Sequence, residues 1–170
     1  MFGKPYAEYL RFQAPFLVAI AAVGFTRLAV SLAGYPTSLV KYVSMTVVFF
    51  AGLVYYGLSV GRTGFGTYRH LLPLAFNQGL VFHAVAIIGI TLSANGLPNV
   101  FDVPEFRGPG ATAETTALPH ALSHLFIGTT VGTLVGWGVA SLVMVIGGRP
   151  RRQDANGAGQ VRSAARGTIQ

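Results

Sequence analysis

The chain has 170 residues, of which 52% are hydrophobic and only 10% are charged, and this excludes an ordinary soluble domain, which carries about 25% charged residues. It contains no cysteine, which excludes disulfides, thiolate metal sites and cysteine nucleophiles. Its formal net charge of +7 comes from basic residues beside apolar stretches, so we interpret the charge as a determinant of membrane topology. We expect the lipid bilayer as a partner and no nucleic acid.

Four long apolar stretches follow one another along the chain. Each is about 20 residues long, which is enough for a helix to cross the roughly 30 Å hydrocarbon layer of a bilayer. The first is too long for a signal peptide and contains Arg27, so we interpret it as a span. The expected fold is all-α, a polytopic integral membrane four-helix bundle over residues 1–148. The predicted transmembrane helices lie at about 14–34, 39–60, 71–93 and 118–147.

The connections differ in length and character. Glycine and proline at 34–38 predict a tight turn, so the first two spans form an antiparallel hairpin. A loop of about 25 residues joins the third and fourth spans, and loops of that length are usually functional or disordered. This loop carries three of the five acids, Asp102, Glu105 and Glu114. The basic tail at 149–170 is polar and rich in small residues, which predicts disorder.

Lysine and arginine are distributed unequally between the two ends of the predicted spans. One side has two, Lys41 and Arg107, and Arg27 lies within a span. The positive-inside rule then places both termini in the cytoplasm and the long loop outside. The excess of arginine over lysine points to a prokaryote, so we expect a bacterial inner membrane. The other side has nine basic residues: Lys4, Arg11, Arg62, Arg69, Arg149, Arg151, Arg152, Arg162 and Arg166.

Arg27 lies in the outer half of the first span. A charged side chain at the bilayer centre costs roughly 2.5–3.5 kcal/mol on insertion scales, so such residues usually face protein or water. Its guanidinium stays charged in any protein. One interpretation is that it extends toward the outer headgroups. The other is that it binds a carboxylate of the loop, helix-end carbonyls, a lipid phosphate, or an anionic ligand such as a quinone oxygen.

His83 lies near the middle of the third span and is a candidate axial ligand of haem b. Helical bundles hold such haems between histidines of facing helices. His124 of the fourth span is the candidate partner, but its predicted depth differs from that of His83 by roughly 8 Å. A tilt or a shifted boundary would have to remove this difference. The alternative is a neutral histidine that hydrogen-bonds a neighbouring helix.

His120 and His124 are four residues apart and share one face of a helix. This spacing is typical of zinc or copper ligands, although one or two more ligands, such as Glu114, would be needed. The alternative is hydrogen bonding at the membrane interface.

Gly128, Gly132 and Gly136 form a ridge of small residues on the fourth span. Such a ridge lets another helix approach closely, either within the chain or in a partner. It predicts a protein partner or a homo-oligomer through this helix.

Three functions remain open, in order of preference. The first is a non-catalytic subunit or partner-binding component of a larger membrane complex. The second is a haem- or quinone-linked electron-transfer protein that uses His83, His124 and Arg27. The third is a transporter or channel-like protein with an outward-facing polar cavity near Arg27. The spans contain no Asp or Glu, which disfavours a proton pump or sodium-coupled transporter, and no catalytic set is visible.

Overall fold

A computed structural model describes residues 1–103, 107 and 109–147. Every regular element within these residues is a helix, and none is a strand. Four stretches of helix are long and apolar enough to cross a membrane, which confirms the predicted all-helical, four-helix class. The predicted disorder of 149–170 and the position of Glu105 lie outside the described residues. The four stretches are Tyr6–Leu32, Thr37–Arg62, Tyr68–Ala94 and Ala113–Gly147.

The first two predicted spans form the expected hairpin, but the bounds of their helices differ from the prediction. Helix α1 covers Tyr6–Leu32 and begins eight residues earlier than expected, because it continues through a less apolar segment. The turn contains Gly34 with a φ of +82°, a conformation that favours glycine. The expected second span is divided into a short helix, α2 (Thr37–Val40), and α3 (Met45–Arg62). The division falls before Ser44, whose side chain caps α3 by accepting from the backbone N–H of Val47.

The third predicted span is a single helix, α4 (Tyr68–Ala94). The fourth comprises three consecutive segments: α5 (Ala113–Leu122), the π-helical η2 (Ser123–Gly128) and α6 (Thr129–Gly147). It begins five residues before the predicted start. The reason is a local one, since the side chains of Thr112 and Thr115 cap the first turn reciprocally.

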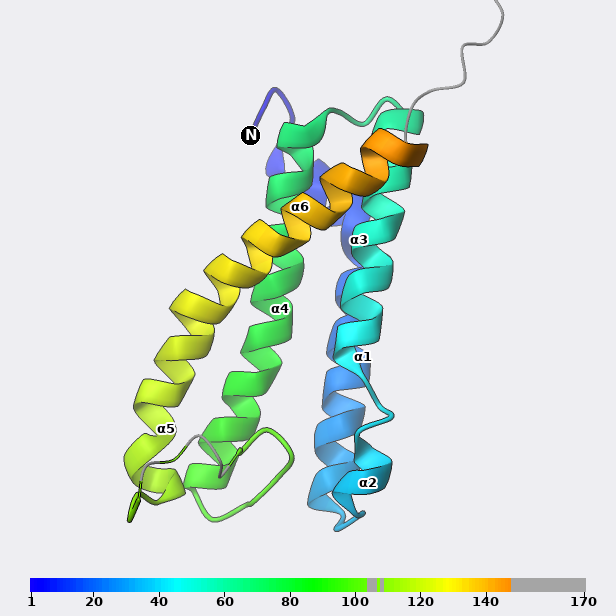
Figure 1. Cartoon of the computed structure of the whole chain (residues 1–170). Helices are drawn as coiled ribbons and strands as arrows, with labels where there is room; N and C mark the ends of the chain where they lie inside the picture. The colour runs from blue at the N-terminus through cyan, green and yellow to red at the C-terminus, as the bar shows by residue number, and fades with distance from the viewer. Residues whose placement is uncertain (104–106, 108, 148–170) are drawn as a thin grey trace, which may run out of the picture.

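Figure 1 shows Met1 and the end of α6 at one end of the bundle, which we call the terminal end. The α1–α2 turn and the chain that follows α4 lie at the opposite end, which we call the loop end. Helix α4 packs against α1, α3, α5 and α6, and α6 crosses it to reach α3. The Arg62 guanidinium donates to the Gly147 carbonyl and joins α3 to α6 at the terminal end. The apolar core includes Ile20, Met45, Leu53, Tyr56, Leu71, Leu74, Ala75 and Val85.

The glycine ridge of the fourth span packs inside this chain. A Cβ atom built on Gly136 would lie 3.2 Å from a methyl of Leu53 on α3. One built on Gly128 would lie 2.6 Å from Cε1 of His83 on α4. The close approach expected from these glycines is therefore between helices of the same chain.

Candidate functional site

His83 and His124 meet inside the bundle. Their Nδ1 atoms are 2.9 Å apart and form a hydrogen bond, and their ring centroids are 5.2 Å apart. The predicted difference in depth is therefore wrong. His83 lies eleven residues before the end of α4 at Ala94, and His124 lies eleven residues after the start of α5 at Ala113. At ~1.5 Å per residue, both lie roughly 16 Å from the loop end of their helices.

The π-helical segment and a glycine allow the two rings to approach. The N–H of Thr129 donates to the carbonyl of His124, five residues earlier, which is the wide turn of a π-helix. The hydroxyl of Thr129 donates to the same carbonyl at 3.2 Å. The His83 ring lies against Gly128, where any larger residue would occupy its place. Short π-helical segments are frequent at functional sites, because they change which side chains face a neighbouring helix.

The hydrogen bond between His83 and His124 restricts their protons. One Nδ1 must donate and the other must accept, so the two rings hold one proton between these atoms. Imidazole changes charge near neutral pH and exchanges protons through both nitrogens. The pair is therefore a site that can receive a proton at one ring and release it from the other.

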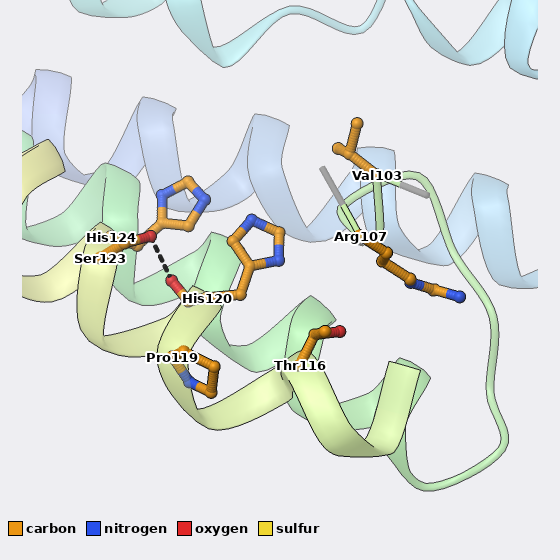
Figure 2. Close-up of a pocket in the computed structure, with 7 residues that line it drawn as sticks. All are labelled: Val103, Arg107, Thr116, Pro119, His120, Ser123 and His124. Carbon is orange, nitrogen blue, oxygen red and sulfur yellow. Dashed lines mark hydrogen bonds between the residues drawn. The ribbon is translucent and has the colours of Figure 1, made fainter. Parts of the chain in front are cut away.

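His120 continues this arrangement toward the loop end. Its ring centroid is 5.0 Å from that of His124, and the two side chains line one cavity of about 400 Å³. Figure 2 shows both rings on the same side of the helix, with Val103 and Arg107 of the loop across the cavity. The Ser123 hydroxyl donates to the His120 carbonyl at 2.7 Å, which ties the helix together between the two histidines.

The loop is held on the bundle by Asp102. Its carboxylate accepts hydrogen bonds from Ser93 at 2.6 Å and from Arg107, with which it also forms an ion pair. Burial raises the pKa of the Asp102 carboxyl, but the hydrogen bonds from Arg107 and Ser93 and the positive charge of Arg107 outweigh it and hold that pKa below its usual value. This carboxylate therefore stays charged and fixes Arg107 beside the histidine cavity.

Arg27 lies in a second cavity, of about 580 Å³, between α1 and the loop. Its guanidinium carbon is 5.5 Å from the centre of the Phe101 ring, a cation–π contact. Among the residues that the structure describes, Arg27 forms no ion pair, and its buried Nε has no hydrogen-bond partner. The structure thus brings His83, His124 and His120 together but places Arg27 in a neighbouring cavity, with Val103 lining both.

Neither of the two predicted metal-containing groups fits the histidines as they are arranged. The axial ligands of a haem lie on opposite faces of the porphyrin, whereas the rings of His83 and His124 are in direct contact. For zinc or copper, His120 and His124 need further ligands, and exposed Glu114 does not line their cavity. Within the described ranges, no group of three or more His, Asp or Glu side chains is arranged to hold a metal ion.

Several residues that build these sites were not anticipated. Phe101 and Asn99 position the loop beside Arg27, and Ser31 accepts a hydrogen bond from the backbone N–H of Val100 at 2.9 Å. The available indication in the sequence was Gly89, which lies inside an apolar helix five residues before its end, because a glycine within a helix often marks a close contact.

The fold and the two sites define an all-helical protein with four helices of membrane-spanning length and polar groups gathered at the loop end. No family model, curated protein or solved structure matches the chain. The chemistry of the site therefore has to be derived from its own residues.

Proposed function

We propose that this chain is an integral membrane protein of a bacterial inner membrane with four spans and both termini in the cytoplasm. The length and hydropathy of the four helices support insertion. Large apolar side chains remain exposed on the outside of the bundle, for example Val47 at 68% and Phe126 at 64%. In water such a surface would be costly, whereas lipid covers it. The basic residues at the terminal end support the orientation.

Within that frame, the function best supported is the passage of protons through the bundle from an outward-facing cavity. The observation that carries it is the hydrogen bond between His83 and His124, beside which the His120 ring lies 5.0 Å from that of His124 and lines the loop-end cavity. Imidazoles joined by a hydrogen bond can pass a proton directly from one ring to the other. This function belongs to the channel-like class rather than to pumps, since the acidic residues of the four helical stretches, Glu8 and Glu114, lie in the first turns of α1 and α5.

Polar groups in the other half of the bundle support the same function. Gln13, Tyr56 and Gln78 are fully buried, on α1, α3 and α4. Each has at least one side-chain polar atom without a partner in the described structure, although Gln78 also donates to the Phe49 carbonyl at 2.9 Å. Buried polar atoms of this kind are normally satisfied by water. Water bound there would extend a proton path toward the terminal end.

The other two functions receive less support. The glycine ridge that favoured a partner is occupied by helices of this chain. The exposed apolar face of α6 favours lipid and a protein partner equally, so a role as a subunit of a membrane complex, or a homo-oligomer through α6, stays a proposal that a mild-detergent pull-down would decide. Electron transfer through a bis-histidine haem receives less support because the rings of His83 and His124 are in direct contact. Arg27 lies in a different cavity from the histidines.

Proton passage is testable with the purified full-length chain in liposomes that contain a pH-sensitive dye. A potassium gradient with valinomycin drives protons across the membrane, and the dye reports the rate of acidification. We expect a rate at least tenfold above protein-free liposomes, and a fall toward the protein-free rate in His83→Gln and His124→Gln. His70→Gln, at the terminal end of the same helix as His83, is the matched control. Wild-type rates equal to those of empty liposomes, or unchanged rates in folded His83→Gln, would reject the proposal.

A further inference from the structure

We infer that the cavity beside Arg27 is a second, separate site that binds a phosphate group. This inference goes beyond the proposed proton passage and does not rest on it. The cavity has a volume of about 580 Å³ and lies between the loop end of α1, the turn after it and the loop that follows α4. Its polar lining includes Arg27, Ser31, Tyr35, Thr37, Asn99 and Asp102.

The first argument is the charge of Arg27. A guanidinium keeps its charge in any protein environment, and a partly buried one requires a counter-charge. The carboxylate in the same cavity, Asp102, is already engaged by Arg107 and Ser93. These three ionised groups, Arg27, Arg107 and Asp102, therefore leave one positive charge in excess. The cavity is suited to an anion.

The second argument is that Arg27 is held in position. Its guanidinium lies over the ring of Phe101, and that ring is seated against Gly89 of α4, where a Cβ would lie 2.5 Å from the ring. The Asn99 side chain donates to the Gly89 carbonyl at 2.7 Å and accepts from the Phe101 backbone N–H at 3.1 Å. A guanidinium that merely extended into headgroups would not need this support. The arginine is preorganised, which reduces the entropy lost on binding.

The third argument concerns ligand chemistry and depth. Guanidinium binds phosphate and carboxylate through paired hydrogen bonds. A phosphate has additional oxygens, and the hydroxyls of Ser31, Tyr35 and Thr37 on the same cavity wall can donate to them. Arg27 lies five residues before the end of α1 at Leu32, roughly 7.5 Å along the helix. In the proposed orientation this is close to the outer headgroup layer, so the phosphate can come from an anionic lipid or from solution.

The test is the thermal stability of the full-length chain in detergent, followed by the intrinsic fluorescence of Trp137 and the tyrosines. The probes are sodium phosphate, with sodium chloride at equal ionic strength as control, and mixed micelles of phosphatidylglycerol, with phosphatidylcholine as control. We expect a phosphate-bearing anion to raise the Tm of the wild type. Arg27→Gln should abolish the shift, and Arg27→Lys should weaken the apparent affinity about tenfold because the paired donors are lost. Arg11→Gln removes the same charge from an exposed position of the same helix and should keep the shift.

The outcomes separate the two sources of phosphate. A shift with inorganic phosphate assigns a soluble ligand, and a shift with phosphatidylglycerol alone assigns a lipid. Equal shifts in wild type and Arg27→Gln, or no shift with either probe, would overturn the inference. If Arg27→Gln does not fold, Gly89→Ala provides a second variant, because its methyl displaces Phe101 and should weaken the shift. His83→Gln should bind phosphate like the wild type, so a failure of proton passage would leave this result unaffected.

Discussion

The ring of His83 occupies the space that a side chain at position 128 would need: a Cβ on Gly128 would lie 2.6 Å from the ring carbon Cε1. The helix crossing and the histidine pair therefore depend on the same small residue. Glycine is required here by close approach, since it lies within a helical segment and not at a turn.

Gly128→Ala should destabilise the bundle and disturb the histidine pair. The added methyl forces the His83 ring to move, and overpacking of this kind costs about 1–3 kcal/mol. Unfolding of the purified chain in mixed micelles by increasing denaturing detergent measures the loss. Gly138→Ala on the same helix is the control, because no atom of the described structure outside its own helix lies within 4 Å of the added Cβ. Equal stability of the two variants would contradict the packing that we describe.

The hydrogen bond from the Tyr6 hydroxyl to Oδ1 of Asn77, 2.6 Å long, joins the start of α1 to α4. Asn77 is 3% exposed, so loss of this donor leaves a buried acceptor unpaired. We expect Tyr6→Phe to lower the free energy of unfolding by about 1–3 kcal/mol. The same substitution at Tyr42, whose side chain is exposed, should have little effect. A stability for Tyr6→Phe within error of wild type would show that water replaces the hydroxyl at no cost.

The attachment of the loop should depend on pH through Asp102. Its pKa in the folded protein is lower than in the unfolded chain, where it is about 3.9. The stabilisation is therefore complete above the unfolded pKa and is lost as pH falls through the folded pKa. The protection factors of the amides at 97–103, which account for the intrinsic slowing of exchange in acid, should fall below about pH 4 in the wild type. In Asp102→Asn they should be low already at pH 7 and change little with acid. A loop that stays equally protected down to pH 2 would argue against this role.

The class of four helices long and apolar enough to span a membrane could be predicted from composition, because apolar length is a property of sequence alone. The bounds were less accurate, since α1 continues through residues that are less apolar but still helical. The depth of His124 was misjudged for a similar reason. Pro119 and the polar residues before it indicated a loop, whereas Thr112 and Thr115 cap a helix that passes through that proline. Because the start of this helix was predicted five residues too late, His83 and His124 were assigned different depths although their rings are in contact.

The second cavity could be predicted only in part. Arg27 stood out as a charge within an apolar stretch, and an anionic partner was among the expectations. The residues that hold it, Phe101 and Asn99, reach it through contacts with Gly89 on another helix. Such contacts join positions far apart in the chain and follow no periodicity, so a single sequence does not reveal them.

The hydrogen bond between the imidazoles of His83 and His124 affects how the protein tolerates substitutions at these two positions. Each ring is the hydrogen-bond partner of the other. An apolar replacement of one histidine therefore leaves a partly buried ring nitrogen of the second without a hydrogen-bond partner. Replacing both histidines with apolar residues removes the donor and the acceptor together, so neither is left without a partner. We therefore expect substitutions of His83 and His124 to be energetically coupled. Replacing both should destabilise the folded protein less than replacing either one alone.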